Sequence, residues 1–452
     1  MSGQVYTTQS VLQSLVERLA RPVDERSCRR AASHVLDWLG SAALGSRMVA
    51  AQGFGNITAR GASGPCQTFG KGRRDWWHAL QLNAAVGNLL EMDDLHRSSI
   101  LHPGPIIIPA AIVVAETVGA TATQLLAAIV RGYEATIRIG RALGPSHYVH
   151  FHNTSTAGAF GAAAAAADLL SLDRNQTAWA LANAGSRTGG LWQMRHEPCE
   201  TKSLHTAQAA QTGVQAAWLA QVGVRGPIAL LEGKQGLFAA MAAGSDAQNV
   251  LSGIADDWLI HEVSFKPWPA CRHAHSTIDA ALALRVRILA EARIEDIAAI
   301  EVSTYQSAVD FCDLAHPETE LQAKFSLQHC AATVLLNGRP WFEHFAVENL
   351  SRLNLVALRH KVRVNVSPSL SARFPAHYGA HIRVTLADGR ALEHDQPDAW
   401  GDPELPLSDA EIIHKSCLLL TDARMEKIDS LVRATLALAD QGSVHAFTEA
   451  WQ

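Results

Sequence analysis

The chain has 452 residues, of which 48% are hydrophobic and 18% are charged, so it carries enough apolar material for a large folded core. Lys and Arg total 38 against 43 Asp and Glu, and this net charge of −5, with both signs interspersed, excludes a general nucleic-acid binder. The 7 cysteines include no Cys-x-x-Cys pair, which argues against a zinc knuckle or an iron–sulfur cluster and favours reduced thiols.

Most of the first 250 residues read as helix. Apolar side chains recur at helical spacing within residues 11–19, 28–39, 76–92 and 122–143. The side chains of residues 157–170 are so small that this helix is expected to touch its neighbours closely, at the centre of a bundle. Residues 203–222 form another Ala-rich helix. We therefore predict a helical bundle for this part of the chain.

The pattern changes after about residue 265. Residues 299–305 alternate as in a half-buried strand, and so do the valines of residues 362–366. Residues 382–386 lead into Asp388 and Gly389, a typical hairpin turn, with a returning strand through Leu392. Ser408 and Glu411 have the spacing of a capping box at the start of a later helix.

These elements predict a mainly α protein, with a large all-helical bundle domain and a smaller α+β lid domain. The predicted boundaries are residues 1–268 for the helical domain, 269–400 for the lid, and 401–452 for C-terminal helices that return to the helical domain.

Nothing in the sequence predicts a membrane location. The first ten residues, MSGQVYTTQS, lack the basic start and the apolar core of a signal peptide. The longest apolar run, residues 105–115, is too short to span a bilayer and stops at Glu116, so we expect a buried helix there. The expectation is a cytoplasmic protein without a membrane partner.

About seven of the 21 histidines fall in motif segments beside carboxylates or cations, and the remainder are expected to be structural. One loop combines them with acidic residues: Glu91, Asp93, Asp94, His96 and His102. A second segment carries His147, His150 and His152. Other histidines stand near cations. His205 follows Lys202, and His273 and His275 follow Lys266 and Arg272. His329 lies in the segment KFSLQHC. Imidazoles next to carboxylates or cations can transfer protons near neutral pH.

Each candidate also has an ordinary structural explanation, because loop histidines are commonly solvated and Asp93 with Asp94 could close or cap a helix. The spacing of His147, His150 and His152 matches no recognised ligand pattern, so we expect no metal site. Lys202 and Lys266 stand in apolar surroundings, where a cation needs an anion nearby. The residues alone therefore favour a cofactor-free acid–base site for a small anion.

Six segments resemble the MmgE/PrpD family, which includes 2-methylcitrate dehydratase, cis-aconitate decarboxylase and iminodisuccinate epimerase. They run through nearly the whole chain in one order: GYEATIRIGRALGPSHYVHFHNTSTAGAFGAAAAAADLLSLD (132–173), KSLHTAQAAQTGVQAAWLA (202–220), LLEGKQGLF (230–238), KPWPACRHAHSTIDAAL (266–282), KFSLQHCAATVLLNG (324–338) and GDPELPLSD (401–409). Such a series is specific for the family and not for the substrate, since members share these segments while catalysing different reactions.

The resemblance implies a large helical domain, a smaller α+β lid, a homodimer, and chemistry that needs no metal or organic cofactor. Matched by motif, the active-site positions would be Glu91, His102, His152, Lys202, Lys266 and His329. Glu91 stands where members often have Asp, Cys271 stands where decarboxylases have His, and His329 replaces a Tyr of many members. These departures favour a substrate other than cis-aconitate.

We therefore predict a lyase, either a dehydratase or a decarboxylase, that acts on a small anionic di- or tricarboxylate of the methylcitrate or aconitate type. Proton abstraction next to a carboxylate builds negative charge, so such a site needs fixed cations as well as a base. The predicted catalytic residues are Glu91, Asp93, His102, His152 and Lys202. The predicted substrate-binding residues are His96, His205, Lys266, Cys271, Arg272, His273 and His329. Two alternatives remain open: an epimerase of a dicarboxylate such as iminodisuccinate, and a non-catalytic binding protein on the same fold.

Overall fold

The computed structural model describes residues 9–197, 199–253 and 257–451. The chain divides into two compact units, Met1–Val263 with Ser408–Gln452, termed the helical unit, and Ser264–Leu407, termed the sheet unit. The described residues are mostly helical and contain one four-stranded mixed sheet, which confirms the prediction of a mainly α protein.

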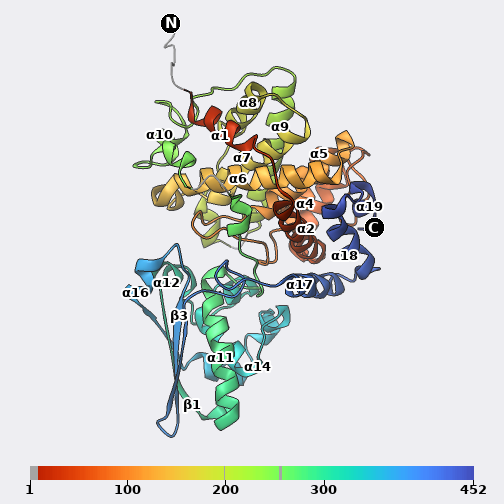
Figure 1. The fold of residues 1–452 in the computed structure, drawn as a ribbon. Helices are drawn as coiled ribbons and strands as arrows, with labels where there is room; N and C mark the ends of the chain where they lie inside the picture. The colour runs from red at the N-terminus through yellow and green to blue at the C-terminus, as the bar shows by residue number, and fades with distance from the viewer. Residues whose placement is uncertain (1–8, 198, 254–256, 452) are drawn as a thin grey trace. The chain divides into compact units, whose positions relative to one another are not determined.

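The helices of the helical unit come from both ends of the chain (Figure 1). They are α1 (Val11–Leu19), α2 (Glu25–Gly45), α3 (Gln52–Thr58), α4 (Trp76–Val86), α5 (Gly104–Val118), α6 (Ala122–Tyr148), α7 (Asn153–Leu169), α8 (Arg174–Gly185), α9 (Thr201–Gln221), α10 (Leu237–Met241), α17 (Asp409–Asp422), α18 (Ile428–Leu436) and α19 (Val444–Glu449). Helix α17 begins at the predicted capping box of Ser408 and Glu411, and it packs on α2.

Helix α7 lies among α5, α6, α8 and α9, as its small side chains predict. A Cβ atom added to Gly161 would lie 2.5 Å from the backbone oxygen of Gly132 in α6. One added to Gly213 in α9 would lie 2.5 Å from the backbone oxygen of Ala159. Both distances are far below van der Waals contact, so these helix crossings require glycine.

The predicted helix 76–92 is too long, because α4 ends at Val86 and the chain then turns. Glu91 has a backbone φ of 60°, a left-handed conformation that cannot continue a right-handed helix. The apolar run 105–115 lies inside α5 and is buried, as predicted. Within the described ranges, no helix combines the length and the apolar character that crossing a membrane requires.

The sheet unit combines four strands with short helices. Its helices are α11 (His275–Glu291), α12 (Gln306–Cys312), α13 (Glu320–Lys324), α14 (Leu327–Asn337), α15 (Leu353–Arg359) and α16 (Pro368–Arg373). Its strands are β1 (Ile297–Thr304), β2 (Val362–Val366), β3 (Ala380–Leu386) and β4 (Ala391–Gln396), in the order β2-β1-β3-β4. The pair β1 and β2 is parallel, and the other two pairs are antiparallel.

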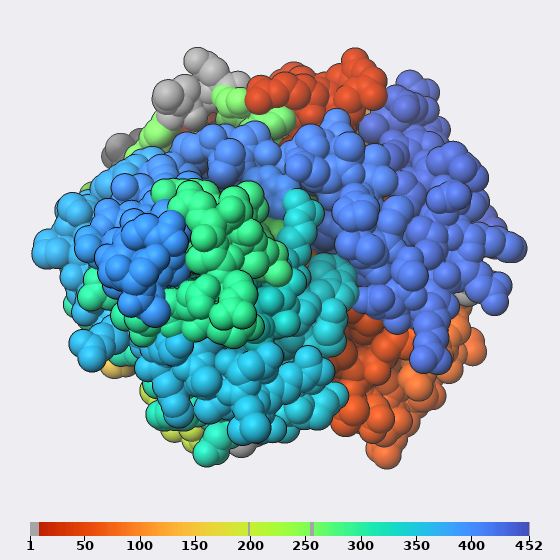
Figure 2. Space-filling view, turned by 90° about the horizontal axis from the view of Figure 1, so that it is seen from below, coloured from red at the N-terminus to blue at the C-terminus, as the bar shows by residue number. Residues whose placement is uncertain are grey.

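Each predicted strand coincides with an observed strand. Val302 of β1 faces Val364 on one side and Ile382 on the other, and the predicted turn at Gly389 has a φ of 89°. Helices α11 and α14 lie along the same side of the sheet (Figure 1). In the space-filling view, the green-to-blue residues of the sheet unit form one continuous surface (Figure 2).

Candidate active site

The acidic candidates lie on the loop that joins α4 to α5, and buried hydrogen bonds fix this loop in the helical unit. Asp94 accepts a hydrogen bond from the backbone N–H of Gly104 through Oδ1, at 2.8 Å. Its Oδ2 accepts a bond from the hydroxyl of Tyr133, at 2.7 Å, and lies 2.8 Å from Nδ1 of His34. Burial lowers the pKa of His34 to about 4, so this ring is neutral. Asp94 therefore anchors the loop to α2, α5 and α6.

Asp93 pairs with His102. The Nδ1 atom of His102 lies 3.1 Å from Oδ2 of Asp93 and 2.7 Å from the backbone oxygen of Asp94. Asn88 donates a hydrogen bond to the same Asp93 oxygen, at 2.8 Å. Because Nδ1 faces two acceptors, it carries a proton, so Nε2 is the nitrogen that can exchange a proton with a substrate.

Glu91 forms an ion pair with Lys202, which lies in the first turn of α9. Glu91 is buried, and the Lys202 side chain is 22% exposed, so the cation can still meet a small anion. The left-handed backbone of Glu91 is strained for a residue other than glycine, a feature that clusters at functional sites.

His152 stands at the N-cap position of α7 and is buried. Its backbone N–H donates to the backbone oxygen of Gly190, at 2.8 Å, and its ring centroid lies 4.7 Å from that of Trp192. The Nδ1 atoms of His152 and His205 are 3.3 Å apart.

Several of the candidate side chains act electrostatically on His152. Burial is the main cause that lowers its pKa well below the ordinary value, and the positive charges of Lys202, His205 and His102 act in the same direction. The charge of Asp93 opposes them. The structure thus brings the catalytic candidates and His205 into one electrostatic neighbourhood of the helical unit, with His152 as a neutral imidazole.

His96, by contrast, has other partners. Its Nδ1 lies 2.6 Å from the hydroxyl of Ser99, and its Nε2 lies 3.2 Å from Oε2 of Glu262. Burial lowers the pKa of His96. These contacts hold the end of the loop, and a role in substrate binding stays a prediction.

The remaining candidates belong to the sheet unit. Lys266 is fully buried, and Arg272, in the short helix η5 (Arg272–Ala274), forms a buried ion pair with Asp402. Arg272 also donates to the backbone oxygen of Trp400, at 3.3 Å. Its guanidinium thus holds the segment that contains Asp402, and a contact with substrate stays a prediction.

His273 lies among aromatic rings, and its Nδ1 is 2.6 Å from the hydroxyl of Tyr305. The backbone N–H of Cys271 donates to the backbone oxygen of Lys324, at 2.9 Å. His329 bonds through Nε2 to the backbone oxygen of His344, at 2.9 Å, and burial lowers its pKa to about 4. All three candidates are therefore buried and held by the sheet unit itself.

Comparison with known proteins agrees with this arrangement of motifs. Residues 16–249 match the MmgE/PrpD N-terminal domain, and residues 268–435 match the MmgE/PrpD C-terminal domain. The chain belongs to the MmgE/PrpD family.

Three proteins are similar in sequence to this MmgE/PrpD protein. It is 28% identical to cis-aconitate decarboxylase of Homo sapiens over 348 residues, which cover 75% of this chain and 71% of the relative. It is 27% identical to cis-aconitate decarboxylase of Mus musculus, over 75% of this chain and 70% of the relative. It is 25% identical to the cis-aconitate decarboxylase-like protein oryM of Aspergillus oryzae, over 83% of each chain.

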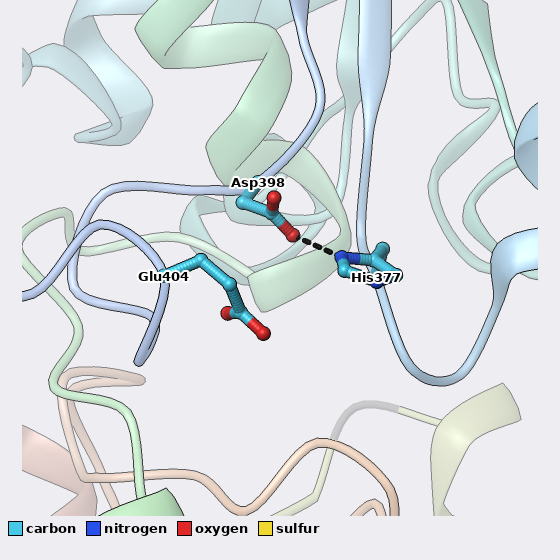
Figure 3. A group of neighbouring side chains, drawn as sticks. All are labelled: His377, Asp398 and Glu404. Atoms are coloured by element: carbon cyan, nitrogen blue, oxygen red, sulfur yellow. Dashed lines mark hydrogen bonds and ion pairs between the residues drawn. The ribbon is translucent and has the colours of Figure 1, made fainter.

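A further group of ligand-type side chains lies in the sheet unit of this MmgE/PrpD protein. His377, Asp398 and Glu404 each offer an atom within 4.8 Å of the others, and His377 points toward Asp398 in Figure 3. The Nδ1 of His377 lies 2.6 Å from Oδ1 of Asp398, and Glu404 is exposed. One nitrogen and two carboxylates suit a divalent cation, but a hydrogen-bonded pair beside an exposed carboxylate is equally ordinary without one.

Sequence reasoning missed the residues that hold the site in place. They are His34, Asn88, Tyr133, Gly190 and Lys415. Nothing near His34 in the sequence indicates its contact with Asp94, a residue 60 positions further along. A polar residue on an otherwise apolar helix face is the one available signal, and Tyr133 and Lys415 both show it.

Proposed function

We propose that this protein is a lyase that decarboxylates a small tricarboxylate of the aconitate type by acid–base catalysis, without a metal or organic cofactor. The observation that carries the proposal is the neutral, buried imidazole of His152 with the pairs Asp93–His102 and Glu91–Lys202 around it. The names of the relatives support decarboxylation over dehydration, since two are cis-aconitate decarboxylases and the third is named for its likeness to one.

The proposed chemistry assigns one task to each group. Lys202 holds a substrate carboxylate and stabilises the negative charge that develops in the transition state. The C–C bond to the departing carboxylate breaks, CO₂ leaves, and the electron pair stays on carbon next to the unsaturated system. A histidine, His152 or His102, then delivers a proton to carbon.

The environments of the two histidines suit different parts of this task. Asp93 and the backbone oxygen of Asp94 fix the ring of His102 through Nδ1, so its Nε2 has a defined direction. His152 is neutral because it is buried near Lys202, so once protonated it is a strong proton donor. We assign His152 as the proton donor, and we propose that His102, held in a defined orientation, binds the substrate.

The other candidates complete the proposal. Lys266 and Arg272 are proposed to bind the remaining carboxylates. His273, Cys271, His329 and His96 are proposed to shape the substrate site. Glu91, Cys271 and His329, which depart from the common family residues, are the positions where a preference for an aconitate-type substrate other than cis-aconitate would arise.

The test is turnover of a panel of citrate, 2-methylcitrate, cis-aconitate and iminodisuccinate, followed by NMR of the products and by release of CO₂. The variants Lys202→Ala and His152→Ala should fold and lose turnover by about 10²–10⁴-fold. His150→Ala is the matched control, because His150 is an exposed histidine two positions from His152 and should keep full activity.

Each other outcome overturns part of the proposal. Wild-type turnover in both active-site variants contradicts the site. Interconversion of stereoisomers without CO₂ release identifies an epimerase. Binding of a panel compound by calorimetry without any turnover identifies a binding protein. Loss of activity after exhaustive dialysis against a chelator contradicts the cofactor-free mechanism.

A further inference from the structure

His205 stands between His152 and a pocket of the helical unit. The pocket has a volume of about 810 Å³, and its walls include Ser155, Gly190, His205 and Gln208. His205 lines this pocket, while its Nδ1 lies 3.3 Å from Nδ1 of His152. One imidazole thus contacts both the pocket and the buried histidine assigned above as proton donor.

The backbone at Gly190 permits this arrangement. Its φ of 126° is a conformation that residues other than glycine rarely adopt, and its backbone oxygen accepts the N–H of His152. A Cβ atom at Gly190 would lie 3.2 Å from Nδ1 of His205 and 2.9 Å from Cβ of Ser155. The chain therefore passes close to the histidine pair without covering it.

The proposed decarboxylation needs a supply of protons. When a carboxylate leaves as CO₂, a C–H bond replaces the C–C bond, so each turnover consumes one proton from solvent. His152 is buried, so its proton must be restored through a neighbouring group. Besides His205, the charged groups that act on His152 are Lys202, His102 and Asp93.

We propose that His205 is a proton relay that restores the proton of His152 from water in the pocket. The inference rests on the proposed function, because only a reaction with net proton uptake requires the relay. In the relay step, the second ring nitrogen of His205 takes a proton from water, and the hydroxide left behind combines with the released CO₂ as bicarbonate, while the Nδ1 proton of His205 passes to Nδ1 of His152. His152 gives its Nε2 proton to the substrate carbon, so one proton enters and one leaves. Both rings then carry their proton on the other nitrogen, and exchange with water returns them to the starting tautomers before the next turnover.

The energetics permit this transfer in both directions. Burial lowers the pKa of both histidines, so neither ring holds a proton strongly at neutral pH. The Nδ1 atoms of the two rings lie 3.3 Å apart, so one proton between them has a short path from His205 to His152.

The turnover experiment uses the full chain with the panel compound that the wild-type protein decarboxylates. His205→Gln keeps a hydrogen-bonding side chain but cannot relay a proton, so we expect kcat to fall about 10²-fold with little change in KM. In His205→Gly, added imidazole should enter the pocket and restore turnover with increasing concentration, whereas pyrazole, of similar shape and far weaker basicity, should not. Gln208→Ala, an exposed wall residue one helical turn along α9, should keep full activity.

A second measurement separates failure of the relay from failure of the proposed function. NMR titration of the histidine nitrogens in the free protein needs no substrate, and it should show coupled titration of His152 and His205 that disappears in His205→Gln. Independent titration of His152, or full activity of His205→Gln, overturns the relay. If the wild-type protein turns over no panel compound while the coupled titration is present, the proposed reaction fails and the relay as proposed falls with it, whereas the histidine coupling itself stands.

Discussion

The Nζ atom of Lys415 lies 2.6 Å from Oδ1 of Asp37, a residue 378 positions earlier in the chain. The same Nζ donates a hydrogen bond to the backbone oxygen of Met92, at 2.8 Å. Both side chains are buried, with exposed fractions of 5% and 2%. The C-terminal helix α17 thus holds the active-site loop directly next to Glu91.

Lys415→Met should destabilise the protein in a pH-dependent manner. Burial raises the pKa of Asp37 to about 6 even with Lys415 opposing it, so removal of the lysine raises this pKa further. A carboxyl whose folded-state pKa exceeds its unfolded value loses stability as pH rises. We expect a loss of about 3 kcal/mol at pH 8 and a smaller loss at pH 5, measured by urea unfolding.

The double variant Asp37→Asn, Lys415→Met tests the cause. Because no titratable group remains in the pair, the stability of the double variant should lack the pH dependence that Asp37 causes, and at pH 8 it should be more stable than Lys415→Met. A loss in Lys415→Met that is equal at pH 5 and pH 8 would show that removal of Lys415 does not change the ionisation of Asp37 between these pH values.

Glu91→Gly should separate stability from activity. Glycine adopts the left-handed φ of 60° freely, so the substitution relieves about 1 kcal/mol of backbone strain. It also removes the partner of Lys202, so turnover should fall by about 10²-fold or more. Thermal unfolding and steady-state kinetics measure the two effects.

Glu91→Gln is the control for this prediction, because it removes the charge and keeps the strained backbone. It should lose activity without a gain in stability. Full activity in Glu91→Gly would show that the reaction does not need the Glu91 carboxylate or its ion pair with Lys202.

Because of His329, the free energy of unfolding should be lower in mild acid than at neutral pH. Burial lowers its pKa to about 4 in the folded state, while the unfolded value is near 6.5. Between these values the unfolded chain binds the extra proton, so stability is present above pH 6.5 and is lost as the pH falls toward 4. The contribution is at most about 1.4 kcal/mol per pH unit, measured by urea unfolding from pH 7 to pH 5.

His329→Gln removes this proton and leaves a donor for the backbone oxygen of His344. The variant should show a shallower loss of stability with falling pH than the wild type. An identical pH dependence would mean that other buried histidines, such as His34, account for the whole effect.

The sequence predicts regular elements well where local spacing decides them. The small side chains of α7 predict close helix packing, and the turn residues Asp388 and Gly389 predict the β3–β4 hairpin. The loop after Val86 is mispredicted as helix, because its conformation depends on Tyr133 and on Lys415, residues far along the chain. Local periodicity contains no information on such contacts.

In the candidate site, too, the residues are visible in the sequence, but their contacts depend on the fold. Motif resemblance identifies Glu91 and Lys202 as residues of interest, but their ion pair joins positions 111 residues apart. The position of His205 between His152 and a pocket is likewise a property of the packed helices α7 and α9. The sequence thus identifies candidate residues, whereas the fold determines which of them contact one another.

The most direct test of the central claim is NMR of cis-aconitate turnover in heavy water, with wild-type protein and His152→Ala compared at equal concentration. Acid–base decarboxylation predicts release of CO₂ and an unsaturated dicarboxylate that carries deuterium at the carbon protonated by the enzyme, with His152→Ala nearly inactive. Deuterium exchange into unchanged substrate without CO₂ release, or equal turnover by His152→Ala, would contradict the account.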